Sequence, residues 1–376
     1  MNLDETPAEA AFRAEVRDRL MAEIVPLVSG RPVGFAERLE ADRRLAAAGY
    51  LGYSWPTRFG GAGGDPIMAG ILDEECSRAG VPRSLSPSRF GADLLAPALM
   101  AHGTDDQLAE LLPGIRDCRT IWCQGFSETE AGSDLANVQS FATDAGDHLV
   151  LNGSKVWTTQ AHEADWCFAL VRTSRDRPRH RNLSFVLFDM KQPGASIRPI
   201  TQLTGEAEFN ELHFDGVRVE HRHVIGGIDD GWRVAMTVVG AERSYGQLSR
   251  YRNYLGQLKA VAAMIQRAEA GPRSTWLREL GELTADVTGI RNSSYKITSL
   301  AAAREPLGVL PSMTKLWWSS THQRLMDLGQ EVAVATGTDL DHWQTEWLRS
   351  RGESIYAGTS QVQRNIVAER MLGLPK

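Results

Sequence analysis

"HLVLNGSKVWTT", residues 148–159, decides the fold, because here the sequence changes from helical to β character. The segment is rich in β-branched and aromatic residues and is bounded by turn residues, as strands are. Three later segments share this character: "WCFALVRT" (166–173), "LSFVLFDM" (183–190) and "NELHFDGVRV" (210–219). Residues 122–226 are therefore predicted to form a small antiparallel sheet or barrel.

The residues before this block predict helices. Apolar residues recur every four positions near the N-terminus, at Phe12, Val16, Leu20 and Ile24, which is helical spacing. "TDDQ", residues 104–107, is a capping box ahead of another apolar run. Residues 1–121 are therefore expected to form a helical domain.

Helical patterning returns after the β block. Apolar positions from Val234 to Ile265 alternate spacings of three and four, which predicts one long amphipathic helix. With further helices to the end, residues 227–376 form a second helical domain. The order helical, β, helical gives a mostly α protein with a β middle domain, and it excludes the parallel α/β architecture of nicotinamide dehydrogenases.

Composition and motifs narrow the function. The 376 residues carry a net charge of −6 with 42% hydrophobic residues, which argues against nucleic acid as a partner. No apolar run approaches the ~20 residues that span a bilayer. The N-terminus is acidic and helical in pattern, so neither a signal nor a transit peptide is expected. The four cysteines lack CxxC pairing and are expected to be reduced thiols in a cytoplasmic protein. The sequence has no zinc spacing, GxSxG elbow or P-loop, so no metal is expected.

Four segments together resemble the acyl-CoA dehydrogenase family of flavoproteins, over essentially the whole chain. They are "LGYSWPTRFGGAG" (51–63), "GFSETEAGSD" (125–134), "NGSKVWTTQA" (152–161) and "IYAGTSQVQRNIVAERMLGLPK" (355–376). Each segment alone is weak evidence for the family, but the order of the four segments and the distances between them are specific to it. The resemblance implies a helical N-terminal domain, an antiparallel β domain and a C-terminal four-helix bundle, with FAD between the last two, in dimers or tetramers.

The resemblance also implies cofactor contacts. Phe126 and Ser127 would contact the isoalloxazine ring, and Ser133 would reach the pyrophosphate and also the substrate. Trp157 would cover one face of the flavin, and Thr159 would donate to its N5 atom. Without the family, Trp157 would be read as a core aromatic on a strand. On a strand only one of Thr158 and Thr159 can face the flavin, and the resemblance selects Thr159.

The catalytic base is missing from its best-known place. Well-known members carry a glutamate before the glycine of "GTS", where this chain has Ala357. The alanine keeps the backbone N–H that the family uses toward the thioester oxygen. Tyr356 is expected beside the substrate, and Thr359 and Gln361 beside FAD.

A second branch of the family places its base on the long helix of the C-terminal domain, and matching that helix selects Glu242. Its helical neighbours at three and four positions, Val238, Val239, Tyr245 and Gly246, are not cationic. We expect burial to raise the pKa of this carboxyl toward that of a base working near neutrality. An exposed helix-surface glutamate is the alternative. The neighbouring Arg243 is expected to help place the thioester or the base.

Two regions depart from the family. The Arg-x-x-Phe-Gly and Gln-x-x-Gly-Gly-x-Gly motifs that reach FAD across a subunit interface correspond here to "PRSTWLREL" and "GQEVAVATGTD", in which Arg273 and Gln330 are remnants. The arginine-rich run at 175–181 is typical of a solvated loop rather than a phosphate site.

Three functions follow. The leading one is an acyl-CoA dehydrogenase that uses Glu242 and passes electrons to electron-transferring flavoprotein. The others are a non-catalytic or half-catalytic subunit of a heteromeric dehydrogenase, since some bacterial relatives pair two different chains, and an oxidase or monooxygenase of the same fold. Homo- and hetero-oligomers both stay open.

Overall fold

The computed structural model describes residues 4–29, 33–244, 247–269 and 271–375, and the side chains of residues 243–247 lie outside the description. By their internal contacts the residues group into two compact units. Unit 1 comprises Met1–Arg31, Asp65–Ser84 and Arg243–Lys376, and unit 2 comprises Pro32–Gly64 and Leu85–Glu242. The domain limits expected after residues 121 and 226 stay a prediction.

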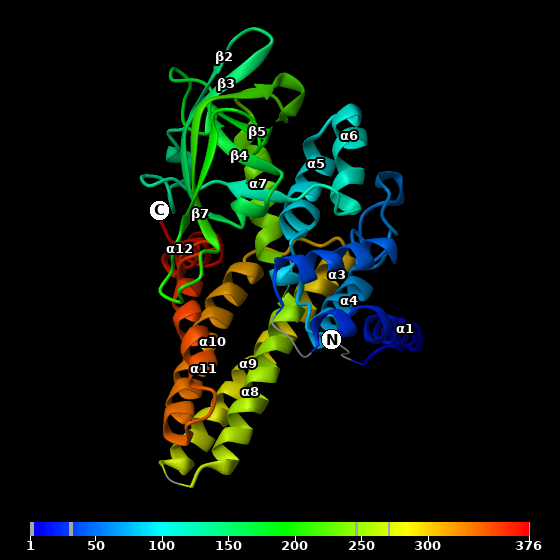
Figure 1. The fold of residues 1–376 in the computed structure, drawn as a ribbon, viewed down its shortest axis with the longest axis vertical. Coiled ribbons are helices and arrows are strands. Elements are labelled where there is room, and N and C mark those ends of the chain that lie inside the picture. Colours follow the sequence, from blue (N-terminus) through cyan, green and yellow to red (C-terminus); the bar gives the residue numbers. More distant parts are fainter. Residues whose placement is uncertain (1–3, 30–32, 245–246, 270, 376) are drawn as a thin grey trace. The chain divides into compact units, whose positions relative to one another are not determined.

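Helices dominate both ends of the chain (Figure 1). Their bounds are α1 (Pro7–Glu23), α2 (Val25–Val28), α3 (Phe35–Ala47), α4 (Pro66–Arg78), α5 (Ala96–His102), α6 (Asp105–Arg116), α7 (Gly231–Ser244), α8 (Gln247–Arg267), α9 (Arg273–Ala302), α10 (Leu310–Thr336), α11 (Leu340–Ser350) and α12 (Ser360–Arg370). The expected capping box is present, because Thr104 and Gln107 exchange side-chain and backbone hydrogen bonds at the start of α6.

The middle of the chain forms one sheet of eight strands. Their bounds are β1 (Trp122–Gly125), β2 (Phe141–Asp144), β3 (His148–Thr159), β4 (Trp166–Arg172), β5 (Leu183–Asp189), β6 (Ala195–Ile200), β7 (Phe209–Glu220) and β8 (Val224–Ile225). They follow the order β6-β7-β3-β2-β4-β5-β8, and β1 pairs with β4. The fold class predicted from sequence is confirmed. The sheet is not wholly antiparallel, because β1 and β2 pair with β4 in parallel.

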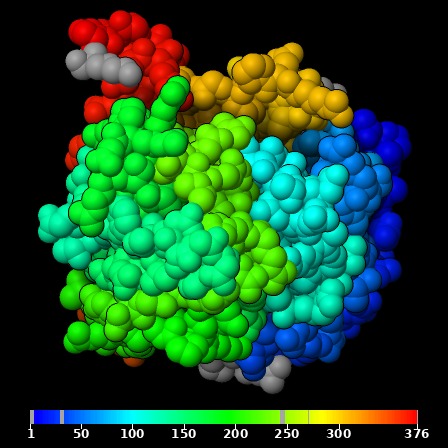
Figure 2. All heavy atoms as spheres, turned by 90° about the horizontal axis from the view of Figure 1, so that it is seen from above, coloured from blue at the N-terminus to red at the C-terminus, as the bar shows by residue number. Residues whose placement is uncertain are grey.

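The apolar run of β4 is continuous because both of its faces are buried. Cys167, Ala169 and Val171 point into a core formed within the sheet. Phe168 and Leu170 point to the opposite face, into a second core shared with α5, α6 and α7. In Figure 2 the cyan atoms of the α5–α6 segment lie beside the yellow-green and green atoms of α7 and the sheet, all within unit 2.

The start of α7 lies directly on β5. A Cβ atom added to Gly231 would lie 2.2 Å from the backbone N of Phe185 and 2.3 Å from the carbonyl carbon of Ser184. Backbone atoms cannot move aside as a flexible side chain can. Glycine is therefore required for this approach of helix to sheet.

We expect Gly231→Ala to lower the free energy of unfolding by about 3 kcal/mol, because the added methyl group overpacks a backbone contact. Gly240→Ala is the matched control in the same helix, since beyond the backbone of that helix no described atom lies within 4 Å of its added Cβ, and it should gain up to ~1 kcal/mol. Urea unfolding measures both. Equal stability of the two variants would contradict the assigned contact.

In unit 1, α8, α9 and α10 pack around one core that includes Trp276 and Trp318, and they run alongside one another in Figure 1.

In the same unit, α1 and α4 are joined by a charged cluster. Glu75 of α4 is buried, and it accepts hydrogen bonds from Arg13 at 2.8 Å and from Arg17 at 2.9 Å. The stripe predicted for α1 is also confirmed, because Val16 and Leu20 are buried.

The long helix predicted from Val234 to Ile265 is described as α7 and α8, and residues 245–246 between them lie outside the described residues. Its continuity therefore stays a prediction. Among the described helices, none combines the length and apolarity needed to cross a membrane.

Candidate functional site

Hydrogen bonds from residues of β3 hold the loop at residues 126–134 in place. The backbone N–H of Val156 donates to the carbonyl of Ser127 at 2.9 Å. Lys155 Nζ, which is completely buried, donates to the Phe126 carbonyl at 3.3 Å and to the Leu170 carbonyl at 2.6 Å. The sheet thus positions the loop that the sequence predicts to hold the flavin.

Sequence reasoning missed the ion pair that holds this loop. Lys155 Nζ lies 2.7 Å from Glu128 Oε1, and the carboxylate also accepts the backbone N–H of Gln139 and that of Ser140. Burial lowers the pKa of Lys155. Burial also pushes the pKa of Glu128 upward, but the Lys155 ammonium and the Gln139 N–H outweigh it, so this pKa lies below its ordinary value. The lowered pKa keeps Glu128 ionised at neutral pH, and Lys155 Nζ lies within hydrogen-bond distance of this carboxylate and of two backbone carbonyls.

The predicted residues of the loop differ in exposure. The Phe126 ring is buried, with its edge toward Phe168 and Phe185, so a cofactor would meet its backbone rather than its ring. Ser127 is half-buried and Ser133 is exposed. Both hydroxyls can therefore still take part in binding.

Trp157 interrupts the regular strand. Its φ angle is +61°, and the register of β3 against β7 shifts between Lys155 and Thr158. A left-handed residue other than glycine costs roughly 1–2 kcal/mol, and such strain concentrates at functional sites. Its indole is 58% exposed and touches only the edge of Phe209 among the described rings. The indole therefore offers an open aromatic face.

The neighbouring threonines lie on opposite sides of the strand. Thr158 is buried, and its hydroxyl has no hydrogen-bond partner among the described residues. Thr159 is half-buried. This alternation agrees with the choice of Thr159 as the outward residue, although its role stays a prediction.

Glu242 lies in the last turn of α7. One turn earlier, Val238 belongs with Phe126 to the core between α7 and the sheet. Glu242 is half-buried. The expected rise of its pKa stays a prediction, and the Arg243 side chain lies outside the described residues.

The second group of predicted residues lies in unit 1, on the turn before α12. Ala357 has φ +53° and Gly358 has φ +84°. Thr359 caps α12 by accepting the Val362 N–H at 3.2 Å. Tyr356 and Gln361 are exposed. The cap that Thr359 supplies is a structural role that the sequence reasoning did not foresee.

The two remnant residues lie on neighbouring helices. Arg273 begins α9 and is exposed, and Gln330 lies on α10. The indole N–H of Trp276 in α9 donates to Glu331 of α10 at 2.7 Å, which joins these two stretches. Gln330 Oε1 is buried without a hydrogen-bond partner among the described residues.

The arginine-rich loop between β4 and β5 is exposed, as predicted for a solvated loop. It also lies against the 126–134 loop, because Arg179 pairs with Asp134. His180 stacks on Trp232 with ring centroids 4.4 Å apart. The loop thus brings the Arg179 guanidinium against Asp134, the residue that follows Ser133.

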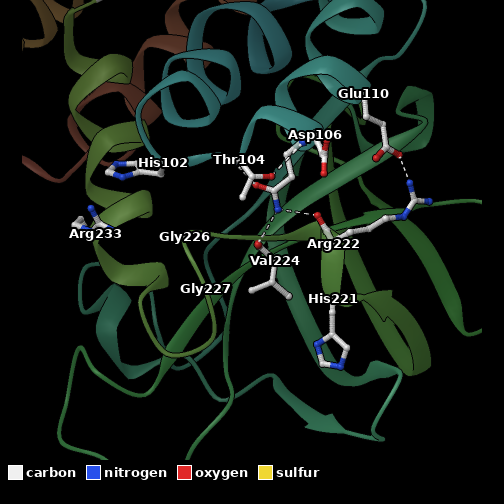
Figure 3. A pocket seen from close by; sticks show the side chains of 11 residues that line it. His102, Thr104, Asp106, Glu110, His221, Arg222, Val224, Gly226, Gly227 and Arg233 are labelled. Carbon is white, nitrogen blue, oxygen red and sulfur yellow. Dashed lines mark hydrogen bonds and ion pairs between the residues drawn. The ribbon is translucent and has the colours of Figure 1, made fainter.

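A separate cavity of about 670 Å³ opens in unit 2 between α6, β8 and α7. Figure 3 shows the residues that line it, among which Gln107 donates to the carbonyls of Arg222 and Val224. Arg222 pairs with Glu110 at 2.7 Å. None of the predicted site residues lines this cavity. In the described part of the chain, no cluster of His, Cys, Asp and Glu could hold a metal ion.

The chain belongs to the acyl-CoA dehydrogenase family of flavoprotein oxidoreductases. It matches the family's N-terminal domain over residues 6–118, its middle domain over 123–217 and its C-terminal domain over 229–372. The family suggested by the four sequence motifs is thereby confirmed.

The chain is also similar to individual proteins of known name. The chain is 40% identical to "Acyl-CoA dehydrogenase IpdE1" of Mycobacterium tuberculosis, with 97% of each chain covered. Its structure is similar to "Tcur3481-Tcur3483 steroid ACAD" with a TM-score of 0.88 and 27% identity, covering 100% of both chains. A TM-score of 0.85 at 25% identity, again over 100% of both, relates it to the ChsE4-ChsE5 complex from Mycobacterium tuberculosis.

The residues present fit the FAD that the family implies. In unit 2, an exposed indole lies on the same strand as the half-buried Thr159, and the hydrogen bond from Val156 joins Ser127 to that strand. In unit 1, the buried Oε1 atom of Gln330 has no hydrogen-bond partner among the described residues.

Proposed function

We propose that this protein catalyses the FAD-dependent α,β-dehydrogenation of an acyl-CoA thioester to the trans-2-enoyl-CoA, with Glu242 as the base. The observation that carries the proposal is the pairing of two facts. The turn carrying Ala357 keeps a backbone donor but no carboxylate, and Glu242 ends a helix packed in the same core as Phe126.

The chemistry divides among three groups. The carboxylate of Glu242 takes the proton from Cα of the acyl group. The N–H of Ala357 donates to the thioester oxygen as negative charge develops there. FAD, when bound, would accept the hydride from Cβ at its N5 atom and later pass the electrons to electron-transferring flavoprotein.

The remaining residues bind and orient. With FAD bound, Trp157 would cover one face of the flavin and exclude water, and Thr159 would donate a hydrogen bond to it. Phe126, Ser127, Ser133, Thr359 and Gln361 hold the cofactor, with Arg273 and Gln330 toward its adenine half.

A second candidate is that this chain works as one of two different chains that share flavin sites. The motifs that would reach FAD across an interface are degenerate here. Two of the similar solved structures are named as pairs of chains, Tcur3481-Tcur3483 and ChsE4-ChsE5. Because the first of these is named a steroid enzyme, a bulky polycyclic acyl group is the first substrate class to test.

Purification of the chain alone, followed by mixing with straight-chain, branched and polycyclic acyl-CoA esters, tests both proposals. A yellow protein that is bleached by one of these esters supports the self-sufficient dehydrogenase. A colourless chain that becomes yellow only with a second chain supports the paired enzyme. Oxygen consumption with a bound thioester would instead mark an oxidase or monooxygenase.

A further inference from the structure

The turn that carries Ala357 has to be held by its surroundings. Its two successive left-handed residues include one with a Cβ atom, and that conformation costs roughly 1–2 kcal/mol. On the α12 side, the buried amide of Gln363 donates to the carbonyl of Ala357 at 3.0 Å and to that of Gly358 at 3.4 Å. These two bonds hold one side of the turn.

The other side of the turn is held by buried polar side chains. Just before the turn lies the short 3-10 helix η7 (Arg351–Ser354). Lys315 Nζ of α10 donates to the backbone carbonyl of Glu353 at 2.7 Å. The Glu353 carboxylate lies 2.8 Å from Nδ1 of His322, also on α10. All three side chains are buried.

His322 is held on both of its nitrogens. Its Nε2 atom lies 3.0 Å from Oε1 of Gln257 in α8. The amide nitrogen of Gln257 faces a carboxylate oxygen of Glu346 at 3.5 Å, which fixes the orientation of the amide. The imidazole therefore meets an oxygen atom on each side, which fixes the plane of the ring. Its face stacks on Tyr254, with ring centroids 4.3 Å apart.

Stability alone does not explain this pair. The second oxygen of Glu353 and the hydroxyl of Tyr254 are buried with no hydrogen-bond partner among the described residues. A buried ion pair offers little net stability over an apolar pair of similar size, because both charges lose their hydration. What such a pair supplies is a defined position for the backbone to which it is attached.

We propose that His322 and Glu353 are positioning residues that fix the turn, so that the Ala357 N–H points at the substrate carbonyl. The catalytic benefit of this positioning rests on the proposed function. The fixing of the turn does not depend on that function. Binding sites need their donors held within about 0.5 Å. A buried, hydrogen-bonded pair one turn before the donor meets that need.

Hydrogen exchange on the full chain tests the positioning. The amides of Ile355 and Tyr356 both donate to the carbonyl of Gly352, at 2.9 and 3.0 Å, and they report on the turn. We expect Glu353→Gln and His322→Gln to raise their exchange at least about tenfold, which corresponds to ~1.4 kcal/mol of local opening. Exchange within α10 should stay unchanged.

Glu75→Gln is the matched control, because it removes another buried, ion-paired carboxylate of the same unit. If it raises exchange at the turn as much as the His322 and Glu353 variants do, the positioning role is wrong. Should a single variant fail to fold, the double variant Glu353→Gln/His322→Gln removes both charges together and leaves neither buried alone. Its turn amides should still exchange faster than those of the wild type, and unchanged exchange overturns the proposal.

Affinity for an acyl-CoA, measured on the same FAD-loaded variants, separates this inference from the proposed function. Faster exchange with weaker binding supports both. Faster exchange with unchanged binding supports the positioning and removes Ala357 from the thioester site. Unchanged exchange overturns the positioning, whatever the affinity.

Discussion

Glu242→Gln is expected to abolish substrate-dependent flavin reduction while leaving FAD and acyl-CoA binding intact. The amide has nearly the same size and still forms hydrogen bonds, but it cannot take the α-proton. Loss of a general base slows the chemical step by about 10²–10⁴-fold. Stopped-flow bleaching of the FAD-loaded protein by an acyl-CoA measures the rate, and calorimetry measures the binding.

The matched control is Glu163→Gln, which makes the same exchange at an exposed position in a short 3-10 helix. It should bleach at the wild-type rate. If Glu242→Gln bleaches within tenfold of the wild type, the base is elsewhere and the assignment to α7 is wrong. If FAD is lost as well, Glu242 has a structural role that was not foreseen.

Lys155→Met is expected to lower the free energy of unfolding by about 3–5 kcal/mol, because it leaves Glu128 charged, buried and without its cation. The 126–134 loop also loses the donor to the Phe126 carbonyl, so FAD affinity should fall too. Urea unfolding and a flavin titration measure the two effects. The double variant Lys155→Met/Glu128→Gln should recover part of the stability, because no buried charge is then left alone.

Lys191→Met is the control for Lys155→Met, since Lys191 also pairs with a carboxylate, Asp165 at 2.6 Å, but is 72% exposed. Its loss should stay below ~1 kcal/mol. The folded-state pKa of Glu128 is lowered, so its contribution is present above the ordinary carboxyl pKa and is lost as pH falls through the lowered one. Lys155→Met should flatten this acid dependence. Equal losses in the two lysine variants would refute the buried pair.

The sequence predicted those strands whose composition is decisive. β3, β4, β5 and β7 lie where residues rich in β-branched and aromatic side chains predict them. β1, β2 and β6 were missed individually because they are only four to six residues long. The parallel pairings with β4 depend on partners distant in the chain, and no local pattern encodes them.

Two residues singled out from the sequence, Trp157 and Ala357, both have a left-handed backbone, while their roles stay predictions. Lys155 was missed because lysines are usually exposed. A signal was nevertheless present, because strand alternation places Lys155 on the same face as the buried Leu149 and Leu151. The His322–Glu353 pair joins residues 31 positions apart, and only the packing of α10 against the following turn brings them together.

The left-handed backbone of Ala357 bears on how this family can diverge. The steric cost of that conformation arises from the Cβ atom, which alanine and glutamate share. Exchange of one for the other therefore leaves the backbone energetics of the turn nearly unchanged. The base proposed on α7 therefore requires no remodelling of the turn, because a glutamate or an alanine at position 357 meets the same backbone cost.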